Sequence, residues 1–255
     1  MGVIGTELFL DDSMSVLERM YCRVFGVPIV GLRIRVRRLM RLLPTSAQAV
    51  LDAGCGRGVI SRLLARRYPD ARVDAIDLDR ETQENNSRLA ARMGLGNCVF
   101  RCADLIGFEN PDAYDLIVSV DNLEHVADDQ GVISRFFKSM RQGGVLLVHV
   151  PHYYRRWPVF RRDVNFDVPG HVRPGYRMED IEKLIEGAGF TVINKGFSYG
   201  FLENLANNIS YFITDAREQR RYLYALLFPF LNLVAWFGQW GRPGFGAGVW
   251  VIARK

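Results

Sequence analysis

A short polar run follows an apolar, strand-like segment in the middle of the chain. Residues 118–128 read VSVDNLEHVAD, so Asp121, Glu124 and His125 fall within five positions. Histidine is well suited to accept a proton near neutral pH, and histidine with carboxylates also ligates divalent metals. Three interpretations are open: a general base, a metal site, or the start of a helix with Asp121 or Asn122 as its cap.

The four histidines of the chain all lie between residues 125 and 171, in a window that begins at this run. A base that takes a proton from an acceptor hydroxyl has three candidates: His125, His152 and Glu124. A divalent metal has four candidate ligands: Asp121, Glu124, His125 and His152.

The surrounding elements are predicted from periodicity. Short runs rich in Val and Ile predict buried strands; these are 49–54, 72–78, 97–105, 114–120, 144–150, 190–198 and 248–255. Amphipathic stretches predict helices; these are 59–68, 81–94, about 124–141, and 178–190. The alternation predicts an α/β fold, a doubly wound Rossmann-like sheet of seven strands with helices on both faces. In such sheets ligands bind beyond the carboxyl ends of the strands.

Two segments fall outside this alternation. Residues 1–46 predict an N-terminal helical appendage with five arginines between 33 and 41, typical of a helix that lies on the core or at a membrane surface. The remainder, 47–255, is the expected sheet domain, with a helical insertion at 200–246. Within the insertion, 222–241 carries no charged residue. Strands on both sides of it should share one sheet, which argues against a membrane span and leaves a lid, a membrane-surface patch or a dimer interface.

A glycine-rich turn follows the first predicted strand. The sequence GCGRG at 54–58 ends a strand and opens a helix, as glycine loops do where backbone approaches a ligand closely. A dinucleotide motif would place its third glycine at Val59, and Asp52 would repel a pyrophosphate. Asp52 instead favours a cationic ligand that carries an amino group.

VLDAGCGRG at 50–58 resembles motif I of the class I S-adenosylmethionine-dependent methyltransferases. Further landmarks of that family follow in order. Asp77 in DAIDLD matches the acid that binds the ribose hydroxyls, with Asp79 as the near alternative, and Asp104 in RCADL matches the acid that receives the adenine amino group. The resemblance implies S-adenosyl-L-methionine as cofactor, with these contacts: Asp52, Gly54, Cys55, Gly56, Gly58, Asp77, Leu78, Ala103, Asp104, Leu105 and Val120.

The sequence signals for the acceptor site are less specific than those for the cofactor site. The polar run is similar to the E-x-x-E-H element of metal-dependent relatives, including ubiquinone-pathway O-methyltransferases, with Asp121 in place of the first Glu. The GHVRPGY segment at 170–176 is similar to a region that borders the active site in family members. It ends a long basic and aromatic stretch at 151–176, and the expected acceptor contacts are Tyr153, Arg156, His171, Arg173 and Tyr176.

These patterns predict a methyltransferase that acts on a hydroxyl of a bulky apolar or lipid-linked small molecule. O-methylation is favoured by elimination, because the N-P-P-[FYW] signature of amine methylation is absent after the fourth strand. The alternatives are a soluble natural-product or sugar methyltransferase, and a catalytically silent cofactor-binding scaffold. Peripheral membrane contact and a homodimer are both open.

Composition limits the partners and the compartment. The net charge of +5 on 255 residues is mild, so we expect no nucleic-acid partner. The four cysteines form no disulfide framework, which favours a reducing cytoplasmic location, at the inner membrane face if the membrane contact exists.

Overall fold

The computed structural model describes residues 4–157, 159–165, 170–214 and 221–255. It divides into two compact units. Unit 1 comprises Met1–Leu42, Tyr154–Asn165 and Gly196–Gly248, and unit 2 comprises Leu43–Tyr153, Phe166–Lys195 and Val249–Lys255. The N-terminal helices and the helical insertion thus belong to the same unit, an association that the sequence did not predict.

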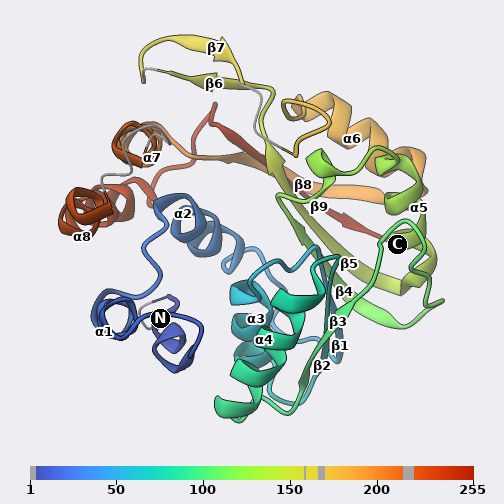
Figure 1. Ribbon diagram of the computed structural model, residues 1–255. Coiled ribbons are helices and arrows are strands. Elements are labelled where there is room, and N and C mark those ends of the chain that lie inside the picture. Colours follow the sequence, from blue (N-terminus) through green and yellow to red (C-terminus); the bar gives the residue numbers. More distant parts are fainter. Residues whose placement is uncertain (1–3, 158, 166–169, 215–220) are drawn as a thin grey trace. The chain divides into compact units, whose positions relative to one another are not determined.

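Seven strands form the main sheet in the order β3-β2-β1-β4-β5-β9-β8 (Figure 1). Their bounds are Ala49–Ala53 (β1), Arg72–Asp77 (β2), Cys98–Cys102 (β3), Tyr114–Val120 (β4), Met140–Pro151 (β5), Thr191–Ser198 (β8) and Gly248–Arg254 (β9). Strand β1 pairs in parallel with β2 on one side and with β4 on the other. The strand order therefore reverses between β1 and β4, where doubly wound sheets bind their ligands.

Helices cover both faces of this sheet, as the alternating pattern predicts. They are α3 (Val59–Arg67), α4 (Arg80–Arg92), α5 (Asp129–Ser139) and α6 (Met178–Gly187). Figure 1 shows α3 and α4 on one side of the sheet, with α5 and α6 on the other. The apolar stripe of each helix faces inward: Leu64 in α3 and Ile181 and Ile185 in α6 are fully buried. The predicted fold class is confirmed.

The predicted helix at 124–141 is wrong at its start. Leu123–His125 forms only a 3-10 turn, η2, and the chain is extended again at Val126. Helix α5 begins at Asp129 because the Asp128 side chain accepts a hydrogen bond of 2.9 Å from the Gly131 amide. Asn122 is the N-cap residue of η2, as one of the predicted interpretations has it, but its side chain makes no capping hydrogen bond, and the longer helix α5 is capped by Asp128.

Unit 1 is built from the chain's two irregular segments and a hairpin. Its elements are η1 (Thr6–Leu10), α1 (Val16–Phe25), α2 (Val30–Leu39), α7 (Phe201–Thr214), α8 (Arg221–Gly238) and the two-stranded hairpin β6 (Tyr154–Arg156) and β7 (Arg162–Val164). The sequence did not predict the hairpin. No described helix is long and apolar enough to cross a membrane.

The arginine-rich helix α2 lies on the core of unit 1, which is one of the two placements that its sequence predicts. Several of its arginines bind within the unit instead of facing solvent or lipid. Arg33 is 3% exposed, and its Nε donates to the Val27 carbonyl at 2.9 Å. Burial lowers the pKa of Arg33 to about 10. The arginines of α2 are therefore a poor argument for membrane contact.

Candidate functional site

The glycine loop between β1 and α3 adopts the backbone that its sequence predicts. Gly54, Gly56 and Gly58 have φ angles of 78°, 49° and 66°, in the left-handed region that glycine enters without steric cost. Gly58 is the N-cap residue of α3. The loop therefore turns the chain sharply from the sheet into the helix, with no side chain at positions 54, 56 and 58.

The surroundings of the three glycines differ. A Cβ at Gly54 would lie 2.3 Å from Cγ of Asn122, and one at Gly58 would lie 2.6 Å from the ring of Phe100. A Cβ at Gly56 would meet no atom within 4 Å. Gly54 and Gly58 are thus required for packing, whereas Gly56 borders open space that a ligand can occupy.

Three polar side chains hold Gly56 in place. Its amide donates to Oδ2 of Asp77 at 2.8 Å, and its carbonyl accepts from Asn86 at 2.8 Å and from Gln83 at 3.2 Å. Gln83 and Asn86 are each 3% exposed in α4. The sequence analysis missed both residues; their position on the otherwise apolar inner face of the 81–94 helix was the available signal.

Asp77 is better placed than Asp79 to receive a ribose diol. Asp79 caps α4, since its carboxylate accepts from the Thr82 amide at 3.2 Å and from the Thr82 hydroxyl at 2.7 Å. Asp77 is half-buried at the end of β2, next to the open space at Gly56. A carboxylate has about four acceptor positions, so Asp77 keeps capacity for a ligand beyond its bond to Gly56.

The other predicted cofactor contacts lie around the carboxyl ends of the strands. The Ala103 amide donates to the Asp77 carbonyl at 3.0 Å, which ties the segment after β3 to the end of β2. Asp104 is exposed, and one of its carboxylate oxygens accepts from the Ile106 amide at 2.9 Å. Leu78 is exposed, Cys55 and Val120 are half-buried, and Leu105 is buried.

Asp52 is a buried carboxyl beneath the loop. It is 2% exposed, and its Oδ2 accepts from the Ser61 hydroxyl at 2.6 Å. The pKa of Asp52 is raised to about 7, mainly by burial; the Ser61 hydrogen bond opposes this shift, and the negative charge of Asp77 adds to it. A cationic ligand nearby would favour the ionised form, as the sequence analysis proposed.

The polar run after β4 is divided between two clusters. In the first, Nδ1 of His149 lies 2.6 Å from Oδ1 of Asp121, with 1% and 19% of these side chains exposed. Asp121 has a φ of 48°, which costs a non-glycine residue about 1–2 kcal/mol. Strain of this kind is typical of functional sites. The sequence analysis did not predict this acid–histidine pair.

The second cluster contains Glu124, His125 and His171. One ligand atom from each lies within 4.8 Å of the others, and the two imidazole rings meet edge to face at 4.5 Å. Nδ1 of His125 lies 2.9 Å from the Gly170 carbonyl oxygen. Burial and the neighbouring His125 lower the pKa of His171.

The predicted set of four metal ligands is therefore not the group that the structure brings together. Asp121 pairs with His149, and the cluster found among the described residues includes neither Asp121 nor His152. His171, predicted as an acceptor contact, takes the third place in the group.

Arg173 and Tyr176 hold the segment around His171 in place. Arg173 forms an ion pair with Asp129 and donates to the Val126 carbonyl at 3.0 Å. The Tyr176 hydroxyl donates toward the Leu123 carbonyl at 3.1 Å and toward Asp129 at 2.7 Å. Burial raises the pKa of Tyr176. The contacts of both side chains therefore position the segment around His171.

The remaining predicted residues are distributed over both units. His152 is 5% exposed and pairs with Tyr176 through an isolated β-bridge, and Tyr153 lies 5.1 Å from the Arg177 guanidinium. Arg156 belongs to the hairpin of unit 1, where its guanidinium lies 5.2 Å from the centre of the Phe245 ring. His152 and Tyr153 therefore belong to the same unit as the glycine loop, whereas Arg156 belongs to unit 1.

Comparisons with known proteins bear on the fold and the family of the chain. Residues 50–144 match a family model described as a methyltransferase domain. Malonyl-[acyl-carrier protein] O-methyltransferase of Acetivibrio thermocellus is 34% identical over 97 residues, which cover 38% of this chain and 33% of that protein. Phosphoethanolamine N-methyltransferase 3 of Arabidopsis thaliana is 32% identical over 199 residues, which cover 73% of this chain and 38% of that protein.

A solved structure shares the fold. It is the O-methyltransferase of a trans-AT PKS multienzyme from Brevibacillus brevis, in complex with S-adenosyl-L-homocysteine. Its TM-score is 0.57 at 16% identity, over 98% of this chain and 79% of that one. This chain spans less than two thirds of each curated relative described above. Residues 50–144 therefore form a methyltransferase domain, which is consistent with the class I S-adenosylmethionine-dependent methyltransferase family that the sequence motifs resemble.

Replacing Gly56 by Ala should weaken S-adenosylmethionine binding at least about tenfold, because the new methyl group enters the space that we assign to the ligand. Gly94 is the matched control, since its φ is 68° and its Cβ would also meet no atom within 4 Å. Both variants carry the same backbone strain of about 1–2 kcal/mol. Equal dissociation constants for the two variants, measured by calorimetry, would contradict this assignment.

Asp52→Asn should change the pH dependence of stability in the absence of ligand. The pKa of Asp52 is about 7 in the folded protein and about 4 in an unfolded chain, so the folded state binds the extra proton. The unfolding free energy of the wild type therefore falls between pH 4 and 7, by about 1.4 kcal/mol per unit of pKa difference, relative to the variant. Denaturant titrations across this range measure the difference, and a constant gap would refute the prediction.

Proposed function

We propose that this chain transfers a methyl group from S-adenosyl-L-methionine to a hydroxyl oxygen of a bulky apolar or lipid-linked small molecule. When bound, the cofactor supplies a methyl group activated on a sulfonium. The chain must align the acceptor oxygen with this group and remove its proton. The observation that carries the proposal is the histidine cluster of unit 2, which offers a base beside the carboxyl end of β4.

His125 has a defined tautomer for this role. The Gly170 carbonyl can only accept, so the hydrogen bond between them requires the proton on Nδ1 of His125. In the neutral ring, Nε2 then carries a lone pair. The side chain is exposed, so an acceptor can reach it. We assign Nε2 of His125 as the atom that receives the acceptor's proton.

Asp121 and His149 act as positioning residues in this proposal. Their bond joins the carboxyl ends of β4 and β5, and the Asp121 amide also donates to the His149 carbonyl at 2.8 Å. These two hydrogen bonds support the left-handed φ of Asp121. The next residue, Asn122, then packs against Gly54. The turn that bears His125 is therefore fixed relative to the glycine loop within unit 2.

The apolar nature of the acceptor is proposed from the charge-free segment 222–241 of the sequence. Helix α8 has no charged residue after Arg221, and many of its large apolar side chains are exposed. Relatives act on different atoms, because one is named an O-methyltransferase and another an N-methyltransferase. The names of the relatives therefore do not distinguish oxygen from nitrogen as the methylated atom. The proposal of oxygen rests on the histidine base, and the acceptor must be identified by experiment.

The full-length protein, incubated with isotopically labelled S-adenosylmethionine and a fractionated extract of the producing cells, should label a component of the organic phase. Mass spectrometry should then find a mass gain of one methylene on a hydroxyl group. Labelling confined to amines, or to water-soluble compounds, would contradict the proposed acceptor. Absence of labelling alongside measurable cofactor binding would instead support a silent scaffold.

His125→Gln should lower kcat for that acceptor about a hundredfold, within the range that a general base contributes. The dissociation constant of S-adenosylmethionine should remain unchanged, because Gln can still donate to the Gly170 carbonyl and leave the turn intact. Added imidazole should restore part of the activity. Full activity in the variant would exclude His125 as the base.

A second candidate role for the cluster is a divalent metal site held by Glu124, His125 and His171. The chemistry of the donors fits zinc or manganese, and His171 adds a buried Nδ1 that has no hydrogen-bond partner among the described residues. If a metal is required, EDTA should abolish methyl transfer, and zinc or manganese should restore it. If His125 is the base, activity should persist in EDTA and show no response to either ion.

A further inference from the structure

Helix α8 and the turn that follows it expose an apolar stripe. Six large side chains recur at intervals of three or four residues and point away from the core of unit 1. We call them the α8 stripe: Tyr222, Leu226, Phe230, Leu233, Phe237 and Trp240. Their exposed fractions range from 49% to 85%. Isolated exposed apolar residues are ordinary, but a stripe along a whole helix marks an interaction surface.

The opposite side of α8 is also apolar, and it is already occupied. Phe228, Leu231 and Ala235 are buried against Val30 and Ile34 of α2. A helix that is apolar all round belongs in a core or in contact with a membrane. Within the described part of unit 1, the apolar core packs against one side of α8, so the exposed stripe is available to a second apolar environment.

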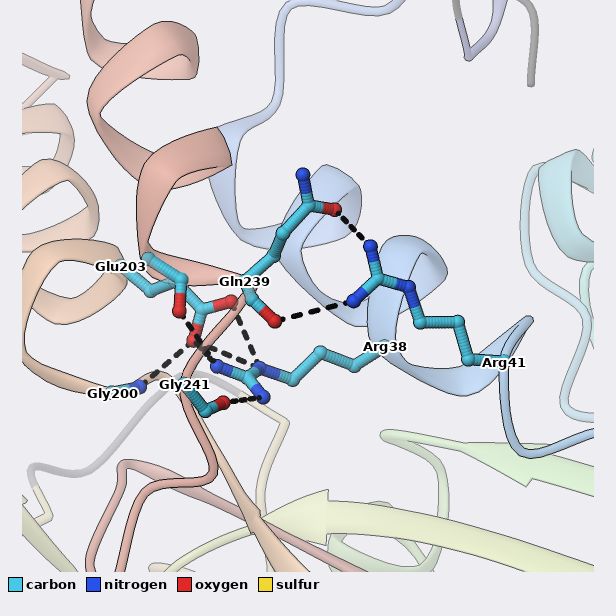
Figure 2. Close-up of polar contacts among 7 residues, drawn as sticks. Arg38, Arg41, Gly200, Glu203, Gln239 and Gly241 are labelled. Atoms are coloured by element: carbon cyan, nitrogen blue, oxygen red, sulfur yellow. Dashed lines mark hydrogen bonds and ion pairs between the residues drawn. The ribbon is translucent and has the colours of Figure 1, made fainter.

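Polar residues are buried beside α8. Glu203 of α7 is fully buried, accepts from the Arg38 guanidinium at 2.7–2.9 Å and receives the Gly200 amide at 2.8 Å (Figure 2). Arg41 donates to the side chain and carbonyl of Gln239 at 2.9 and 3.2 Å. The interior of unit 1 near α8 thus contains these polar groups as well as the apolar cluster, while large apolar side chains of α8 stay exposed.

The same bonds fix the orientation of α8. Arg38 also donates to the Gly238 and Gly241 carbonyls at 3.1 and 2.9 Å, so the C-terminal end of the helix is held on α2 by charge-assisted hydrogen bonds. At the other end, the Tyr21 hydroxyl donates to the Ala225 carbonyl at 2.6 Å. A rotation that would bury the stripe against α2 would break these bonds and leave Glu203 buried without its partner.

We infer that the α8 stripe binds the interface of a lipid bilayer that contains anionic lipids. The stripe has aromatic residues with polar edges at its two ends, Tyr222 and Trp240, and purely apolar residues between them. That distribution suits a helix lying in the plane of the headgroups. In the sequence, Arg221 precedes the charge-free segment and Arg242 follows it, and flanking arginines suit anionic headgroups.

Charge argues against a second copy of the chain as the occupant. In a two-fold antiparallel pairing of α8 with its copy, the Arg221 end of one helix meets the Arg242 end of the other. Arg221 and Arg242 would then approach each other, and residues 222–241 offer no acidic group to neutralise them. A bilayer with anionic headgroups complements both ends at once. The inference depends on unit 1 alone and does not rest on the proposed methyl acceptor.

The test is flotation of the full-length protein with phosphatidylcholine vesicles, with and without phosphatidylglycerol, in the absence of cofactor. Wild type should float with the anionic vesicles, and high salt should reduce the bound fraction. The double variant Leu226→Gln with Phe230→Gln should bind at least about tenfold more weakly, because it removes two apolar contacts with the acyl region. Arg242→Gln should weaken binding to anionic vesicles only.

Ile193→Gln is the matched control, since Ile193 is 51% exposed in unit 2 and its replacement should leave flotation unchanged. Wild-type protein that fails to float, or a double variant that floats like wild type, would overturn the inference. A third result would also overturn the inference: analytical ultracentrifugation shows that the wild type is a dimer and the double variant a monomer, and neither protein binds vesicles. None of these outcomes bears on methyl transfer, which is assayed separately.

Discussion

The close approach of Gly54 to Asn122 is the contact on which the geometry of the site depends. It joins the loop after β1 to the turn after β4, across the point where the strand order reverses. Only glycine fits at position 54, because a Cβ there would overlap the Asn122 side chain. The ligand space at Gly56 and the histidine cluster after β4 are therefore parts of one rigid edge of unit 2.

Much of this unit was predictable from the sequence, because its strands and helices arise from local periodicity and its loop from glycines. The strand before Asp77 and the turn at 54–58 were both located correctly. The predicted helix at 124–141 failed because apolar periodicity outweighed a local signal, the Asp128 cap. The pair formed by Asp121 and His149 was out of reach, since it depends on β4 and β5 being neighbours and on a left-handed backbone at Asp121.

Unit 1 was less predictable for a different reason. Its segments are distant in sequence, and their association depends on contacts such as Arg38 with Glu203, which local patterns do not reveal. The arginines of α2 were a misleading signal for membrane contact, because several serve as internal hydrogen-bond donors. The charge-free segment at 222–241 was the informative one. Its exposed half remains apolar while polar groups such as Glu203 occupy the interior.

The central claim is that unit 2 binds S-adenosylmethionine at the carboxyl edge of its parallel strands. Isothermal titration of the wild-type protein with S-adenosylmethionine tests it most directly, with S-adenosylhomocysteine as competitor. The account predicts saturable binding at one site per chain with a dissociation constant in the micromolar range, displaced by the competitor. No detectable binding at millimolar cofactor would contradict it.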